Sequence, residues 1–263
     1  MTVDPVVGCV FRPQNPPERL TAAARTADDV GVEEIWLWED CFLHGGLTAA
    51  AIALAGSERV RIGVGVLPVP LRNVALTAME IATLERAFPG RLRVGVGHGV
   101  QDWMSQVGAR VASPLTLLRE YATALHRLLR GNTVTVAGRY VTLTEVRLDW
   151  PPPAPVDVLL GATGPKTLAL AGEVAAGTVL TGGTSPDGVR DAVAVIRRHA
   201  PDPDAHRVVT YVPVDGDAAA LTDAVRRWHR AGSDTVVLEP PADADGVAFI
   251  RAVGDGVLPA LRG

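Results

Sequence analysis

The sequence is poor in lysine and cysteine. Lys166 is the only lysine among its 25 basic residues, and Cys9 and Cys41 are its only cysteines. Two cysteines are too few for a disulfide framework and, even with His44 near Cys41, too few to indicate a zinc site, so we expect no metal. Lys166 falls at the start of a predicted helix rather than at the end of a strand, which argues against Schiff-base chemistry in a barrel.

Charge and hydropathy exclude two further classes of protein. The 25 basic and 29 acidic residues give a net charge of −4 and form no basic stripe, so we expect no nucleic-acid partner. No apolar run approaches the roughly 18 residues of a membrane span, and no signal peptide precedes the first predicted strand. We therefore expect no membrane partner and a cytoplasmic location. Hydrophobic residues make up 48% of the chain, which is enough for a large core.

Short apolar or β-branched runs alternate with segments of helical period. The clearest helix has Ser113 as its N-cap, Pro114 in the first turn and Gly131 as its end. The predicted strands are Val6–Phe11, Glu34–Trp38, Val60–Leu67, Leu92–Gly97, Val156–Gly161, Thr178–Thr181, Arg207–Pro213 and Thr235–Glu239. The predicted helices are Pro16–Val30, Ala75–Phe88, Ser113–Arg130, Gly164–Ala175, Pro186–His199, Ala218–Ala231 and Ala244–Leu261.

This alternation predicts an α/β fold with parallel strands. Eight strand–helix units in 263 residues match the size of a (β/α)₈ TIM barrel, and we expect residues 1–263 to form one such domain. A doubly wound sheet, with two domains at this length, is the alternative, but no clear linker divides the chain. The segment Thr133–Leu143, with a turn at Gly138, is predicted to be a small hairpin inserted before strand five.

Two glycine-rich turns follow predicted strands. In RLRVGVGHGVQDW the glycines fall at Gly95, Gly97 and Gly99, which is the wrong spacing for the dinucleotide fingerprint G-x-G-x-x-G. They are typical instead of a barrel strand whose glycines face the narrow interior of the barrel. The second turn, GATGPK (161–166), opens a helix, whose free N–H groups beside Lys166 suit a phosphate. An ordinary loop with Lys166 facing solvent is the alternative.

A cluster of acidic residues closes the second predicted strand. In WEDCFLHGG (38–46), Glu39 and Asp40 stand next to Cys41, and paired carboxylates can perform acid–base chemistry. His44 and His98 are the two histidines that follow strand ends, where a functional role is expected. At this point neither a catalytic pair nor a nucleophile can be assigned from the residues.

Four segments in the same order resemble the luciferase-like monooxygenase superfamily, especially its deazaflavin-dependent branch. The resemblance covers most of the chain, and it implies a TIM barrel that binds FMN or coenzyme F420 at the C-terminal mouth. The segments are PPERLTAAARTADDVGVEEIWLWED (16–40), RVRIGVGVLPVPLRN (59–73), FPGRLRVGVGHGVQDWMSQVGA (88–109) and GATGPKTLALAGEVAAGTVL (161–180).

The resemblance also implies roles for particular residues. A non-prolyl cis peptide that supports the cofactor ring is expected at Gly65–Val66, and Asp40 matches the carboxylate that faces the cofactor. Cys41 and Val100 stand where related enzymes have a histidine and a glutamate, so the proton donor is open between His98 and Glu39. The cofactor-binding set implied by the resemblance is Asp40, Gly65, Val66, Gly97, Gly99, Gly161, Ala162, Thr163, Gly164, Lys166, Gly182 and Gly183.

From the resemblance we expect an oxidoreductase that transfers a hydride between coenzyme F420 and a small organic substrate, with Asp40, His98 and Glu39 as candidate catalytic residues. An FMN-dependent monooxygenase that uses reduced flavin and oxygen is the first alternative. A non-catalytic protein that binds flavin or deazaflavin is the second. Members of the family are often homodimers, and we expect one here. The mouth of the barrel is predicted to be lined by Trp38, Phe42, Leu67, Trp103 and Met104.

Overall fold

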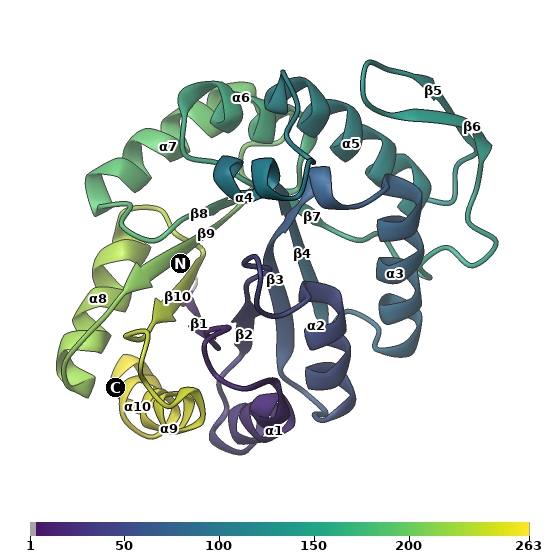
Figure 1. Ribbon diagram of the computed structural model, residues 1–263. Coiled ribbons are helices and arrows are strands. Elements are labelled where there is room, and N and C mark those ends of the chain that lie inside the picture. Colours follow the sequence, from purple (N-terminus) through teal and green to yellow (C-terminus); the bar gives the residue numbers. More distant parts are fainter. Residues whose placement is uncertain (1–3, 263) are drawn as a thin grey trace.

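In the computed structural model, which describes residues 4–262, eight parallel strands close into a barrel surrounded by helices (Figure 1). The order around the barrel is β1-β10-β9-β8-β7-β4-β3-β2. The predicted TIM-barrel class is therefore confirmed. The barrel strands are β1 (Val6–Val10), β2 (Glu34–Leu37), β3 (Arg61–Pro68), β4 (Leu92–Gly97), β7 (Val158–Gly161), β8 (Gly177–Leu180), β9 (Arg207–Pro213) and β10 (Thr235–Glu239).

The helices cover the outer face of the barrel, and two of them escaped prediction. The segment of α2 has no helical period because GLTAAAIALA is apolar on all sides, and α4 is only six residues long. Ser113 stands at the N-cap of α5 as expected, but its hydroxyl bonds that of Thr116 instead of a backbone N–H. The helices are α1 (Leu20–Val30), α2 (Gly46–Ala55), α3 (Val74–Ala87), α4 (Gln101–Gln106), α5 (Pro114–Leu129), α6 (Pro165–Val174), α7 (Pro186–His199), α8 (Ala218–Arg230), α9 (Gly246–Ala252) and α10 (Leu258–Arg262).

The predicted hairpin insertion is present between α5 and the fifth barrel strand, β7. Strands β5 (Val134–Ala137) and β6 (Thr142–Val146) pair antiparallel outside the barrel. The Glu120 carboxylate on α5 accepts the N–H groups of the hairpin turn, from Arg139, Tyr140 and Val141, at 2.9–3.0 Å. One carboxylate thus fastens the turn to the barrel helix.

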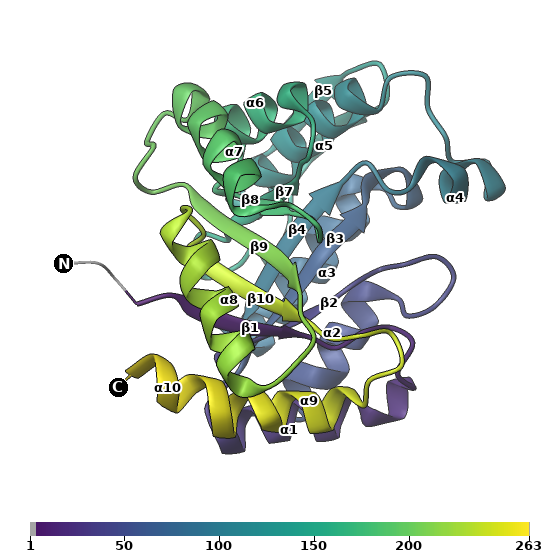
Figure 2. The same ribbon diagram turned by 90° about the vertical axis from the view of Figure 1, so that its left-hand side faces the viewer.

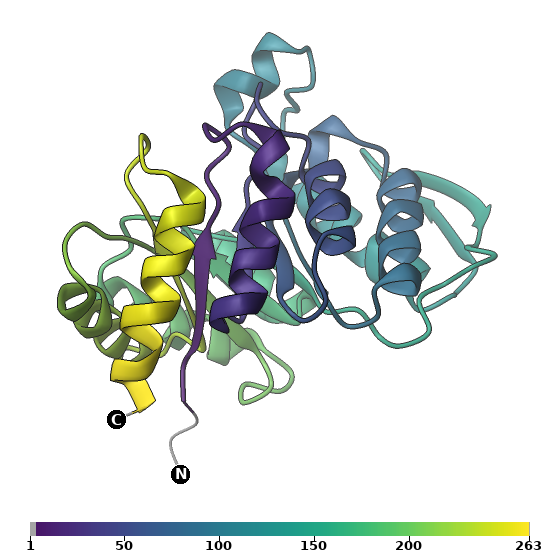
Figure 3. The same cartoon turned by 90° about the horizontal axis from the view of Figure 1, so that it is seen from below.

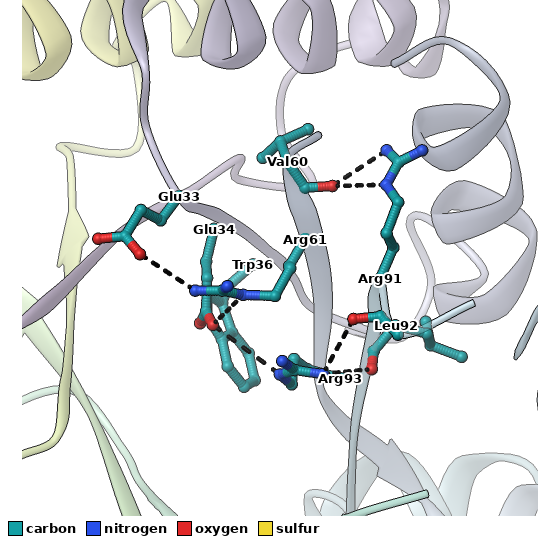
Figure 4. A network of polar contacts seen from close by, with 9 residues as sticks. Glu33, Glu34, Trp36, Val60, Arg61, Arg91, Leu92 and Arg93 are labelled. Carbon is teal, nitrogen blue, oxygen red and sulfur yellow. Dashed lines mark hydrogen bonds and ion pairs between the residues drawn. The ribbon is translucent and has the colours of Figure 1, made fainter. Parts of the chain in front are cut away.

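A charged network closes the N-terminal end of the barrel (Figure 4). Glu34 on β2 is buried, and its carboxylate accepts from the Trp36 indole N–H at 2.9 Å and from Arg61 Nε at 3.0 Å. Arg93 Nε lies 3.9 Å from the same carboxylate. Burial lowers the pKa of the Arg93 guanidinium, and the charge of Glu34 opposes that shift. The network satisfies charges that would otherwise be buried alone.

The middle of the barrel is filled by two large aromatic side chains, Trp36 and Tyr211. Their rings meet edge to face at 5.9 Å between centroids. A Cβ at Gly63 would lie 2.3 Å from the Trp36 ring, and one at Gly65 would lie 2.1 Å from the Tyr211 hydroxyl. The absence of side chains at Gly63 and Gly65 on β3 therefore makes room for these rings.

The loops after the strands gather at one end of the barrel. Figure 2 shows α4 beyond the tips of the strands, at the end opposite the two chain termini. No helix within residues 4–262 is long and apolar enough to cross a membrane.

Candidate active site

A cavity of about 750 Å³ opens at the C-terminal ends of the barrel strands. Its walls contain every candidate catalytic and cofactor-binding residue inferred from the sequence except Gly164 and Lys166. Trp38 and Trp103 also line it, as expected. The other three residues expected at the mouth do not line the cavity. Leu67 and Met104 are buried in the core, and Phe42 is 65% exposed on the loop after β2.

The floor of the cavity is formed by Val66, whose side chain packs against the backbone of glycines. The Gly65–Val66 peptide is cis, as expected, and the pairing of β3 with β4 shifts between Val64 and Leu67. The Val66 side chain crosses to the neighbouring strands. A Cβ would lie 2.7 Å from it at Gly97, 2.9 Å at Gly95 and 3.0 Å at Gly161. The two glycines of the VGVG pattern, together with Gly161, thus leave room for the Val66 side chain.

Two adjacent carboxylates line one side of the cavity, and their surroundings differ. Glu39 is buried, and its Oε2 accepts the Gly46 N–H at 2.6 Å and the Arg72 Nη2 at 3.0 Å. Arg72 also bonds Glu80 on α3. No hydrogen bond to the Asp40 carboxylate is formed within the described residues. Burial raises the pKa of Asp40, and the nearby Arg12 guanidinium opposes part of that shift.

An ion pair joins the two strands that close the barrel. Glu239, at the end of β10, lines the cavity, and its Oε1 accepts from Arg12 Nη2 at 2.6 Å. Arg12 also donates to the Pro240 carbonyl and lies over the Trp38 ring, 5.2 Å from the centroid. Arg12 is therefore held by groups of the protein through Nε, through Nη2 and through its contact with the Trp38 ring. A Cβ at Gly182 would lie 2.6 Å from Glu239 Oε2, so the bare backbone there makes room for the second carboxylate oxygen.

Tyr211 and His98 complete the polar walls. The Tyr211 hydroxyl donates to the Gly65 carbonyl at 3.1 Å, which holds the floor from below, and burial raises the pKa of this phenol well above its ordinary value. His98 Nε2 lies 3.2 Å from Thr167 Oγ1 on α6. Burial lowers the pKa of His98, so its imidazole is neutral near pH 7. His44, the other histidine after a strand, stacks on Phe11 away from the cavity lining.

The second glycine-rich turn forms the start of α6, with Gly164 as its N-cap. The Ala162 N–H donates to the Val179 carbonyl at 3.1 Å, so this amide belongs to the sheet. The helix begins at Pro165, which has no N–H group, and the N–H groups of Thr167 and Leu168 both donate to the Gly164 carbonyl at 3.0 Å. The N–H groups of Thr163, Gly164 and Lys166 have no partner among the described residues. Lys166 is exposed beside them and outside the cavity lining.

Several residues of the lining were not inferred from the sequence: Tyr211, Glu239, Thr167 and Thr181. Tyr211 and Glu239 belong to β9 and β10, which were correctly predicted as strands but carry no glycine-rich motif. Their position at the end of a predicted strand is the only signal that was available, and the barrel rule that catalytic residues follow strand ends points to Glu239.

The fold and this cavity define a TIM-barrel protein with a ligand site at the C-terminal face. The chain matches the luciferase-like monooxygenase family over residues 6–252. It therefore belongs to that family.

Relatives of assigned activity cover most of the chain. The 5,10-methylenetetrahydromethanopterin reductase of Methanolobus tindarius is 28% identical over 97% of this chain and 81% of its own length. The F420-dependent glucose-6-phosphate dehydrogenase of Nakamurella multipartita is 29% identical, but the match covers 65% of this chain and 54% of the relative. The coenzyme F420-dependent tetrahydromethanopterin reductase structure from Methanopyrus kandleri superposes with a TM-score of 0.87 at 19% identity, covering 98% of this chain and all of that one. At this identity the superposition shows the fold.

Proposed function

We propose that the protein is an oxidoreductase that transfers a hydride between coenzyme F420 and a small organic substrate. The observation that carries the proposal is the floor of the cavity, where the Val66 side chain lies against the backbone of Gly95, Gly97 and Gly161. The F420-dependent dehydrogenase relative supports this cofactor.

The residues present fit a planar cofactor ring with a phosphorylated tail. A volume of about 750 Å³ lies in the usual range for cofactor and ligand pockets. Val66 and the three glycines provide a flat apolar seat, and Tyr211 fixes it from below. When bound, F420 supplies a ring carbon that accepts or releases a hydride. The phosphate is assigned to Thr163, Gly164 and Lys166 at the start of α6, where free N–H groups and a positive charge meet.

Asp40 is assigned to proton exchange, because its carboxylate lines the cavity without a partner among the described residues and its raised pKa brings it closer to neutrality. His98 is assigned to orienting the ligand from the opposite wall, where Thr167 holds its ring. Glu39 is assigned to anchoring the loop, since Gly46 and Arg72 already occupy its oxygens.

Titration with F420 and with FMN under anaerobic conditions tests the proposal. We expect F420 to bind with saturation and FMN to bind more weakly, because the glucose-6-phosphate dehydrogenase relative is F420-dependent. The family name supports the second candidate, a monooxygenase that uses reduced FMN and oxygen. Tight FMN binding without F420 binding would reject the first candidate in favour of the second. In the F420 complex, Asp40→Asn is expected to retain cofactor affinity and to lose turnover.

We also propose that two chains associate through the outer faces of α2 and α3, which lie side by side (Figure 3). Ile52, Leu76 and Met79 are 40%, 48% and 57% exposed on these faces. The segment of α2 contains no charged residue, and a helix that is apolar on all sides is normally covered. A second copy presents the same patch, so a symmetric contact covers both.

Sedimentation of the wild type and two variants tests this dimer. Ile52→Glu places a charge inside the proposed contact and is expected to give a monomer. Val107→Glu makes the same kind of exchange at a side chain that is 46% exposed beside α4, and is expected to leave the dimer intact. A monomeric wild type, or an Ile52→Glu protein that still sediments as a dimer, contradicts the assignment.

A further inference from the structure

The cavity contains acidic side chains and no permanent cation. Glu39, Asp40 and Glu239 line it, whereas no lysine or arginine is present among the described residues of its wall. His98 is the one histidine among the described residues of the wall, and burial lowers the pKa of its imidazole, which is therefore neutral near pH 7. Bound anions in proteins are normally matched by a positive group or by several N–H donors, because an unmatched buried charge is costly.

The nearest cations cannot turn to a ligand without breaking existing bonds. Arg12 donates to Glu239 and to the Pro240 carbonyl while it covers Trp38. Arg72 divides its guanidinium between Glu39 and Glu80. Both guanidinium groups therefore neutralise protein carboxylates and leave no positive charge for a substrate.

Glu239 differs from Glu39 in having an oxygen left for a ligand. Both carboxylates line the cavity, but both oxygens of Glu39 accept hydrogen bonds, whereas Arg12 contacts only Oε1 of Glu239. Glu239 Oε2 lies against Gly182, where there is no side chain to cover it. Two buried nitrogen atoms of cavity-lining residues, Trp38 Nε1 and His98 Nδ1, have no hydrogen-bond partner among the described residues.

We infer that Glu239 is a specificity-determining residue, and that the substrate is a non-anionic alcohol carrying a second hydrogen-bond donor, which binds Glu239 Oε2. The inference rests on the proposed function. With F420 bound, the cofactor would take up the hydride released when the alcohol is oxidised to a carbonyl, and Asp40 would accept the hydroxyl proton. The second donor, a hydroxyl or an ammonium group, stays on Glu239. Substrates with a phosphate or a carboxylate at that place are rejected.

Three ligands with one phenyl carbinol core test this selection: 1-phenyl-1,2-ethanediol, 2-amino-1-phenylethanol and mandelate. Their third substituents carry a neutral donor, a cationic donor and an anion. Calorimetry on the F420 complex measures their binding without requiring turnover. We expect mandelate to bind at least about tenfold more weakly than the other two, because the wall offers it no cation. Whichever of the diol and the amino alcohol binds with the higher affinity shows whether Glu239 prefers a neutral or a charged donor.

Matched variants separate Glu239 from the general charge of the cavity. Glu239→Gln is expected to weaken binding of the amino alcohol, and so to reduce the ratio of its affinity to that of mandelate. Glu33→Gln, which removes a partly exposed carboxylate at the opposite end of the barrel, is expected to keep the preference over mandelate. Val100→Lys, at a position 47% exposed on the rim, is expected to improve mandelate binding by supplying the missing cation.

The outcomes distinguish this inference from the proposed function. Failure to bind F420, followed directly by cofactor fluorescence, rejects the proposed function. F420 binding together with mandelate affinity equal to that of the diol, or with no affinity for any of the three ligands, rejects the substrate class alone. An unchanged preference in Glu239→Gln rejects the role of Glu239.

Discussion

Replacing Glu34 by alanine is expected to destabilise the barrel far more than the same change at its neighbour Glu33. The Glu34 side chain is 5% exposed, and it binds the Trp36 indole, Arg61 and Arg93 (Figure 4). Its loss leaves a buried N–H without an acceptor and Arg93 without its counter-charge. Removing one partner of a buried ion pair costs about 3–5 kcal/mol.

Glu33 provides the matched control, because it contacts the same Arg61 at 3.2 Å but its side chain is 43% exposed. A solvent-exposed pair contributes less than about 1 kcal/mol, so Glu33→Ala is expected to be nearly neutral. Urea unfolding followed by circular dichroism gives both free energies, and the melting temperature of Glu34→Ala is expected to fall by roughly 6–20 °C. Glu34→Gln keeps an acceptor for Trp36 and is expected to lie between the two alanine variants. Equal stabilities of Glu33→Ala and Glu34→Ala would refute the reasoning.

Three other predictions follow from single contacts. Gly97→Val places a side chain on Val66 at the cavity floor and is expected to weaken F420 binding at least about tenfold, with the circular dichroism spectrum unchanged. Burial lowers the pKa values of His98, His126 and His206 below 6.5, so the unfolded state takes up protons first. The free energy of unfolding should therefore fall as the pH drops below 6.5, and a flat profile from pH 7 to 5 contradicts this. Glu120→Ala is expected to speed proteolysis within residues 133–146, while an unchanged cleavage rate would show that the turn holds without it.

The barrel was predictable because its strands and its surrounding helices each produce a recognisable pattern of apolar residues in the sequence. Buried parallel strands are continuous apolar runs, so β4, β9 and β10 were predicted with their observed limits. The α2 helix was missed for the opposite reason. Its sequence is apolar on every side, and without a polar face the helical period disappears.

The candidate site was predictable where it consists of backbone and much less so where it depends on side chains from distant strands. The glycine-rich motifs and the resemblance to a known family predicted that Gly65 and Val66 form part of the site, together with Gly97 and Gly161. The pair of Arg12 and Glu239 joins residues 227 positions apart, and only closure of the barrel brings them together. The second cis peptide, Cys41–Phe42, also left no pattern in the sequence.

The tryptophans give the protein a built-in optical reporter. Trp38 and Trp103 line the cavity, and Trp36 lies fully buried in the barrel below. The other two tryptophans are Trp150, 71% exposed, and Trp228, whose indole N–H bonds the Thr184 carbonyl. Replacing Trp150 and Trp228 by phenylalanine would leave an emission signal that comes from the barrel interior and its mouth. Occupancy of the cavity could then be followed in real time without any attached dye.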